Sequence, residues 1–161
     1  MTMKKASSLS WAMAMFIVVT AGPASAAMEI RRINFNPDGR DSATNSHLNR
    51  EYIYLVNTGP QAQQLRGWKL FDRGREHVYR FGALHLEPGD TIHLRSGRGN
   101  DGAPVCEVGG SCPENTHYDF YWGLTEYAWD NGGDRATLIN DAGSVVDRCR
   151  YGASASDPKR C

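Results

Sequence analysis

The sequence predicts an all-β fold of about seven to eight strands. Short apolar runs rich in aromatic and β-branched residues alternate with Gly, Pro, Asn and Asp turn signals, and residues 51–94 contain no helical period. The runs cover residues 51–57, 65–71, 77–81 and 91–95. In the last run Ile92 and Leu94 alternate with polar side chains, which is typical of an antiparallel strand with one buried face.

Further strands are expected on both sides of these runs. Residues 28–35 form a first strand whose apolar positions break strict alternation, as a β-bulge would allow. A turn-rich loop follows over 36–46, and residues 96–112 form a long Gly-rich connection. Residues 118–122 form a strand or an irregular aromatic segment, and the chain ends in a meander of 127–129, 135–139 and 144–150. This spacing predicts a β-sandwich or a small barrel.

The first 26 residues have the layout of a secretory signal peptide. Lys4 and Lys5 precede an apolar stretch over 11–21, and a small-x-small cleavage site ends at Ala26. A membrane anchor is the alternative, but the apolar stretch is well short of the roughly 20 residues that span a bilayer. We therefore expect a secreted mature domain of residues 27–161, with a C-terminal tail over 152–161 and no stable membrane anchor.

The net charge of the mature chain argues against nucleic acid as a partner. The whole sequence has 18 Lys and Arg and 18 Asp and Glu, so removing Lys4 and Lys5 leaves 16 minus 18, or −2. Such a balance gives no global attraction to polyanions or anionic membranes.

Four cysteines in an exported chain predict disulfides. Three connectivities are possible, and we favour Cys106–Cys112 with Cys149–Cys161 because both close short loops. A zinc site is the competing use of these cysteines. The sequence has no CxxC pair, which argues against zinc.

The ordered set of short motifs resembles a bacterial secreted lamin-tail domain over about residues 28–151. The motifs are Asn36-Pro-Asp-Gly-x-Asp, Asn49-Arg-Glu-Tyr-Ile-Tyr-Leu-Val-Asn57, Leu65-x-Gly-Trp-x-Leu-x-Asp72, His77-x-Tyr-x-Phe81, Leu86-x-Pro-Gly89, Gly97-x-Gly99, Trp122, Trp129-Asp-Asn131, Gly133-Asp-x-Ala-x-Leu138 and Gly143-x-x-x-Asp147. The resemblance implies an immunoglobulin-like antiparallel β-sandwich, and residues 106–114 look like an insertion into it. The expected core comprises Ile53, Leu55, Trp68, Leu70, Ile92, Leu94, Trp129 and Leu138.

Catalytic residues are not expected, because the sequence has no Gly-x-Ser-x-Gly elbow, His-Glu-x-x-His motif or P-loop. The resemblance and this elimination favour a non-catalytic recognition, adhesion or structural module at the cell surface or outside the cell. The alternative is a small secreted metal-dependent hydrolase or nuclease that uses Asp38, Asp41 and His47. No cofactor is expected, apart from Ca²⁺ on Asp38, Asp41 and Asn45. An ordinary β-turn explains the same loop residues.

Aromatic residues give the other candidate binding site. Six of them lie within residues 118–129, too many for one strand face to bury. Exposed members of this group would form a platform for a protein partner or a cell-surface glycan; the candidates are Tyr118, Tyr121, Trp122 and Tyr127. The alternative is a second apolar cluster beneath the long loop.

Cleavage of the signal peptide gives a direct test. The mature protein should begin at Ala27, because the small-x-small site ends at Ala26. Intact-mass analysis of protein from the culture medium measures this. Secreted protein that retains Met1 would contradict the assignment.

Overall fold

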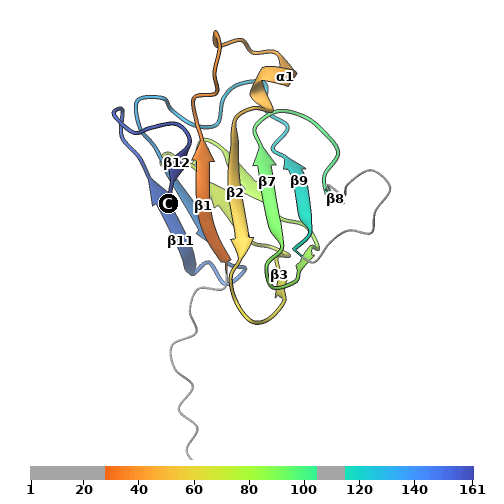
Figure 1. Cartoon of the computed structure of the whole chain (residues 1–161). Helices are drawn as coiled ribbons and strands as arrows, with labels where there is room; N and C mark the ends of the chain where they lie inside the picture. Colours follow the sequence, from red (N-terminus) through yellow and green to blue (C-terminus); the bar gives the residue numbers. More distant parts are fainter. Residues whose placement is uncertain (1–27, 105–114) are drawn as a thin grey trace, which may run out of the picture.

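Two β-sheets face each other in the computed structural model of the chain, which describes residues 28–104 and 115–161 (Figure 1). The expected signal peptide and the Cys106–Cys112 pair lie outside the described residues. The prediction of an all-β, immunoglobulin-like sandwich is confirmed, since eight strands of three or more residues form the two layers. Four further strands have only two residues each.

The larger sheet has the strand order β12-β1-β2-β7-β9-β8. Its bounds are β1 Met28–Asn34, β2 Tyr52–Asn57, β7 Thr91–Arg95, β8 Ala103–Pro104, β9 His117–Tyr121 and β12 Lys159–Arg160. The expected bulge is present in β1, because Ile30 pairs with Leu55 and Arg32 with Tyr54, which leaves Arg31 as the extra residue. The loop before β2 ends in a one-turn helix, α1 (Asn45–Leu48), which the sequence pattern did not indicate.

The second sheet has the order β11-β10-β4-β5, and a two-stranded ribbon pairs β3 with β6. The bounds are β3 Gln63–Gln64, β4 Lys69–Phe71, β5 Val78–Arg80, β6 His85–Leu86, β10 Arg135–Ile139 and β11 Val145–Arg150. The strand expected over 65–71 is shorter than predicted. Gly67 adopts a φ of 83° in a turn closed by the Trp68 amide on the Leu65 carbonyl, so pairing begins only at Lys69.

One strand pair departs from the antiparallel prediction. β9 runs parallel to β7, with Thr91 opposite His117 and His93 opposite Asp119. Strands of a parallel pair need a long return connection, and residues 96–116 provide it.

The core fills the space between the two sheets. All eight residues expected there are buried, and six of them have no exposed surface: Ile53, Leu55, Leu70, Ile92, Leu94 and Leu138. Each such aliphatic side chain contributes about 1.5–3 kcal/mol when it leaves water. Trp68 and Trp129 also belong to this core.

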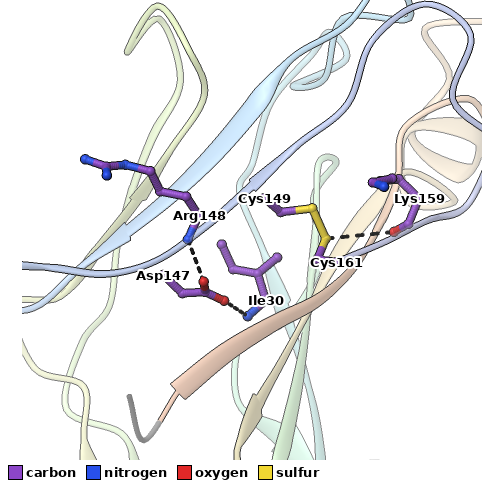
Figure 2. Close-up of a disulfide and its surroundings, with 6 residues drawn as sticks. All are labelled: Ile30, Asp147, Arg148, Cys149, Lys159 and Cys161. Atoms are coloured by element: carbon purple, nitrogen blue, oxygen red, sulfur yellow. Dashed lines mark hydrogen bonds between the residues drawn. A yellow bond between two sulfur atoms is a disulfide. The ribbon is translucent and has the colours of Figure 1, made fainter. Parts of the chain in front are cut away.

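A side-chain hydrogen bond and a disulfide connect the two sheets along the β1 and β11 side of the sandwich. Asp147 of β11 accepts a hydrogen bond from the amide of Ile30 at 2.7 Å, beside the bulge (Figure 2). Cys149 of β11 is bonded to Cys161, as predicted, and this anchors the tail that carries β12. β12 in turn pairs with the outer edge of β1.

Among the described residues, no helix has the length and hydrophobicity needed to cross a bilayer.

Removing the Cys149–Cys161 disulfide should lower the free energy of unfolding by about 2–3 kcal/mol, because the bond closes a loop with a sequence separation of 12. Guanidinium unfolding of a Cys149→Ala/Cys161→Ala variant measures the loss. A Ser154→Ala/Ser156→Ala variant, at two exposed positions of the same tail, is the control for substitution in this segment. An unchanged unfolding midpoint in the first variant would contradict a structural role for the bond.

Candidate functional site

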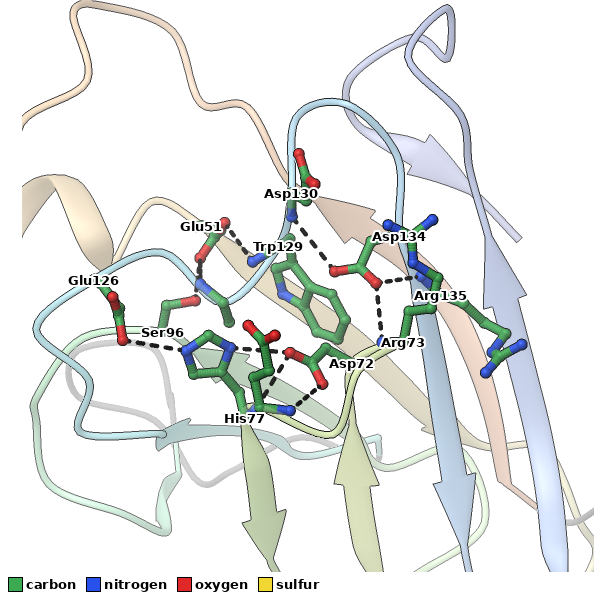
Figure 3. Close-up of polar contacts among 12 residues, drawn as sticks. Glu51, Asp72, Arg73, His77, Ser96, Glu126, Trp129, Asp130, Asp134 and Arg135 are labelled. Carbon is green, nitrogen blue, oxygen red and sulfur yellow. Dashed lines mark hydrogen bonds and ion pairs between the residues drawn. The ribbon is translucent and has the colours of Figure 1, made fainter.

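A buried carboxylate organises the end of the sandwich that carries α1. Glu51 directly precedes β2 and has no exposed surface. Its carboxylate accepts a hydrogen bond from the Ser96 hydroxyl, at the end of β7 (Figure 3). It also accepts the amides of Ala128 at 2.8 Å and Trp129 at 3.1 Å. One side chain therefore connects two neighbouring strands to the segment that precedes β10.

These bonds explain why the strand expected over 127–129 is absent. The amides of Ala128 and Trp129 point at the Glu51 carboxylate and not at a neighbouring strand. The segment is consequently a loop, and its Trp129 side chain is buried in the core.

Burial raises the pKa of Glu51 to about 8, because the carboxylate loses its contact with water. The Ser96, Ala128 and Trp129 hydrogen bonds act in the opposite direction, and the negative charge of Asp134 raises the pKa further. Glu51 is therefore largely protonated near pH 7, unlike an exposed glutamate. In this form its O–H would donate to Ser96 Oγ, and both oxygens would keep a lone pair for the two amides.

Two other carboxylates hold the neighbouring loops by binding backbone amides. Asp72 accepts the amides of Glu76 at 2.9 Å and His77 at 3.2 Å, and its Oδ2 lies 3.0 Å from His77 Nδ1. Asp134 accepts the amides of Arg73 at 3.0 Å and Arg135 at 2.7 Å. Both aspartates are buried, so their oxygens serve the turn after β4 and the turn before β10.

An acidic hollow of about 520 Å³ lies between these loops. It is lined by Asp72, Arg73, Gly74, Glu76, His77, Glu126, Tyr127, Ala128, Trp129, Asp130 and Asp134. Five of these side chains are carboxylates and only one is an arginine. Glu76, Glu126 and Asp130 are exposed at the hollow, whereas the deeper Asp72 and Asp134 are bound to amides.

Further groups in the hollow are polar but give no catalytic set. His77 Nε2 lies 3.5 Å from Glu126 Oε1, at the limit of a hydrogen bond. Within the described part of the chain, the buried indole nitrogen of Trp129 has no acceptor. The nearby Ser96 hydroxyl is fully buried and already donates to Glu51, so it is closed to a substrate. The arrangement can accept cationic groups, which suit the exposed carboxylates of Glu76 and Glu126, whereas the exposed Asp130 also accepts the Gly132 amide at 2.7 Å.

The four aromatic residues predicted to bind a ligand lie in different places. Tyr118 packs against the core. A Cβ at Gly99 would clash with the ring of Tyr121, so the loop after β7 covers that ring closely. Trp122 makes edge contacts with Trp129 and the ring of Tyr79. They do not form one continuous platform, and a binding role for any of them stays a prediction.

Tyr127, the fourth aromatic candidate, is tied to the loop that carries the alternative catalytic residues. Its hydroxyl lies 2.6 Å from His47 Nδ1 and donates to the Ser42 carbonyl at 3.0 Å. His47 is buried on α1 with this tyrosine as its partner, while Asp38 and Asp41 are exposed. The described contacts therefore do not join His47 to either aspartate.

Asn45, the third proposed Ca²⁺ ligand, is used by the backbone of the loop after β7. Its side-chain amide donates to the Arg98 carbonyl at 3.0 Å, and its oxygen accepts the Arg98 amide at 2.6 Å. Calcium binding by Asp38, Asp41 and Asn45 stays a prediction.

A histidine pair that the sequence analysis did not find lies on the outer face of the larger sheet. His117 Nε2 is 3.0 Å from His93 Nδ1, and His117 Nδ1 is 2.7 Å from the Thr91 hydroxyl. Among the described residues, His93, His117 and Asp119 form a group whose ligand atoms all lie within 4.8 Å of one another. Only the parallel pairing of β7 with β9 brings these residues together, so spacing along the chain gave no signal.

Desolvation favours the neutral form of both histidines. It lowers the pKa of His93 to about 3, and the positive charge of Arg95, like any protonation of His117, acts in the same direction. Desolvation also lowers the pKa of His117, against the opposing charge of Asp119. Two neutral imidazoles with a carboxylate nearby are a donor set that borderline-soft metal ions prefer.

Comparison with known proteins gives one assignment. A family model described as Lamin Tail Domain matches residues 21–153, which include the last six residues of the expected signal peptide. A search of curated proteins found no match.

The raised pKa of Glu51 predicts how stability depends on pH. The folded-state pKa of about 8 lies above the ordinary value of 4.5, so the folded protein binds more protons than the unfolded chain between these values. Stability from this group is therefore greatest at low pH and falls by a few kcal/mol as pH rises from about 5 to 8. Chemical denaturation across this range measures the slope.

A Glu51→Gln variant isolates the titrating group. We expect lower stability overall, because the amide cannot accept hydrogen bonds at both of its atoms, together with a shallower decrease from pH 5 to 8. Glu87→Gln, at an exposed turn, is the control and should keep the wild-type slope. Parallel slopes for wild type and Glu51→Gln would show that Glu51 has an ordinary pKa.

Proposed function

Because the chain belongs to the lamin tail domain family, we propose that the mature protein is a secreted recognition module that holds a cationic segment of an extracellular or cell-surface protein in its acidic hollow. The family fits a non-catalytic structural or interaction module with an immunoglobulin-like fold. The partner, the secretion and the adhesion role belong to our proposal.

The observation that carries the proposal is that some carboxylates of the hollow are buried and bound to backbone amides, while others are exposed to solvent. Asp72 and Asp134 accept backbone amides, and Glu51 beneath them does the same, so these acids hold loops in place. Glu76, Glu126 and Asp130 remain exposed on the loops so fixed. Negative charges held by rigid loops can orient a cationic partner without a large entropic cost.

The shape of the hollow favours a side chain over a flat surface. Its volume of about 520 Å³ is within the range of small-ligand sites. An arginine or lysine that enters it would meet Glu126 and Glu76 at the rim.

Export is supported by two separate features. The first 26 residues have the order of a signal peptide, and the Cys149–Cys161 disulfide suits an oxidising compartment. Neither feature identifies the partner.

Charge removal at the rim tests the proposal. Immobilised residues 27–161 should retain Arg- and Lys-rich peptides in preference to Asp- and Glu-rich peptides or neutral oligosaccharides. A Glu76→Gln/Glu126→Gln variant should bind the cationic peptides at least tenfold more weakly, because it removes the exposed charges without touching the amide-binding aspartates. Biolayer interferometry at two salt concentrations measures the affinities, and rising salt should weaken wild-type binding.

The matched control is Glu29→Gln/Glu87→Gln, which removes the same charge outside the hollow. Equal weakening by both double variants would show attraction by net charge alone. Preferential retention of oligosaccharides would contradict a protein partner and indicate that the ligand is a glycan. Metal-dependent cleavage of DNA or a phosphoester, lost in Asp41→Ala, would favour the hydrolase.

A further inference from the structure

The outer face of the larger sheet carries three potential metal ligands on two adjacent strands. His93 lies on β7, and His117 and Asp119 lie at alternate positions on β9, where their side chains share one face. His93 and Asp119 are paired across the strands, and Thr91 is paired with His117. This face lies outside the acidic hollow, so the inference is independent of the proposed function.

We propose that His93 Nδ1, His117 Nε2 and the Asp119 carboxylate bind a divalent transition-metal ion, with Zn²⁺ as the ion that this donor set fits best. Two imidazoles and a carboxylate are common zinc ligands, whereas Ca²⁺ prefers an all-oxygen shell. A three-ligand zinc site keeps its fourth position for solvent or another ligand.

The distance between the two nitrogen atoms suits a shared ion. Zinc–nitrogen bonds of about 2.0–2.1 Å at a tetrahedral angle place two nitrogen ligands roughly 3.3 Å apart. His117 Nε2 and His93 Nδ1 are 3.0 Å apart. Small rotations of the two imidazole rings that separate these atoms by a few tenths of an ångström would therefore admit the ion. As a hydrogen bond, the 3.0 Å contact requires a proton on one of the two facing nitrogens. Metal binding requires that proton to move to the other nitrogen of the same ring, so that both facing nitrogens present lone pairs.

Neighbouring groups already orient the ligands. Thr91 Oγ1 lies 2.7 Å from His117 Nδ1, where it can accept the Nδ1–H and leave the Nε2 lone pair facing His93. Arg95 Nε donates to Asp119 Oδ1 at 2.8 Å, which fixes the carboxylate and leaves its second oxygen free of that bond. The rings of Tyr52 and Tyr54 pack against His93 at centroid distances of 4.5 and 4.8 Å.

Two positively charged groups lie near the proposed ligands: Arg32 lines the same hollow as both histidines, and Arg95 is bonded to Asp119. Arg32 and Arg95 oppose a cation, but Arg95 is paired with Asp119. Arg32 is only partly buried, and solvent screens its charge.

The open side of the site indicates what a bound ion would meet. A hollow of about 360 Å³ is lined by Arg32, Tyr54, His93 and His117. The Arg32 guanidinium beside the fourth metal position suits an anionic ligand such as a carboxylate or a phosphate.

Other histidines of the described chain lack such a set. The Asp72 carboxylate beside His77 is already bound to two amides, and His85 meets only Glu87, at 3.5 Å on the surface. His85 is therefore a suitable control.

Calorimetric titration of tag-free, chelator-treated residues 27–161 with Zn²⁺ tests the proposal. We expect one ion per chain and a higher melting temperature with Zn²⁺, and no comparable response to Ca²⁺. His93→Ala and His117→Ala should weaken zinc binding at least a hundredfold, and Asp119→Asn about tenfold. His85→Ala should leave the affinity unchanged.

A measurement on the wild-type protein keeps the test valid if a variant does not fold. In long-range ¹H–¹⁵N spectra, substoichiometric Zn²⁺ should shift the imidazole nitrogens of His93 and His117 and leave those of His77 and His85 in place. Absence of zinc binding, unchanged affinity in a folded His93→Ala variant, or shifts confined to other histidines would overturn the proposal and leave the pair a structural cross-strand contact.

Discussion

The buried carboxyl group of Glu51 is the constraint on which the α1 end of the sandwich depends. It is bonded to Ser96 at the end of β7 and to two amides of the loop before β10, so it fixes loops that approach from both sheets. Deleting an acceptor of this kind leaves each buried donor unsatisfied, at about 1–3 kcal/mol apiece. Ala128 and Trp129 line the acidic hollow, so Glu51 also fixes the position of that part of its wall.

The fold class could be predicted because local patterns and burial agree along most strands. Ile92 and Leu94 alternate with polar residues, and the structure buries both completely. Pairing direction could not be predicted, because a parallel pair and an antiparallel pair leave the same alternation in each strand. The strand expected over 127–129 is absent for a different reason. Its aromatic composition suits a strand, but the amides of Ala128 and Trp129 donate to Glu51, which is distant in sequence.

The candidate sites were harder to predict, because their residues are distant in sequence and because successive side chains of a strand point to opposite faces of the sheet. Tyr118 and Tyr121 are close along β9 but belong to opposite faces, so a cluster in sequence is divided in space. His93 and His117 are 24 residues apart and become neighbours only through the register of β7 and β9. The acidic hollow likewise combines Asp72, which follows β4, with Asp134, which precedes the antiparallel neighbour β10.

The Cys149–Cys161 disulfide has a mechanical consequence. Because Cys161 is bonded to Cys149, tension on the C-terminus would bypass residues 150–160 and enter the fold at β11. Met28 begins β1 in the larger sheet, whereas Cys149 lies in β11 of the second sheet. Tension between these two points would therefore pull one sheet against the other, and the core packing and the Asp147–Ile30 hydrogen bond between the sheets would bear the load.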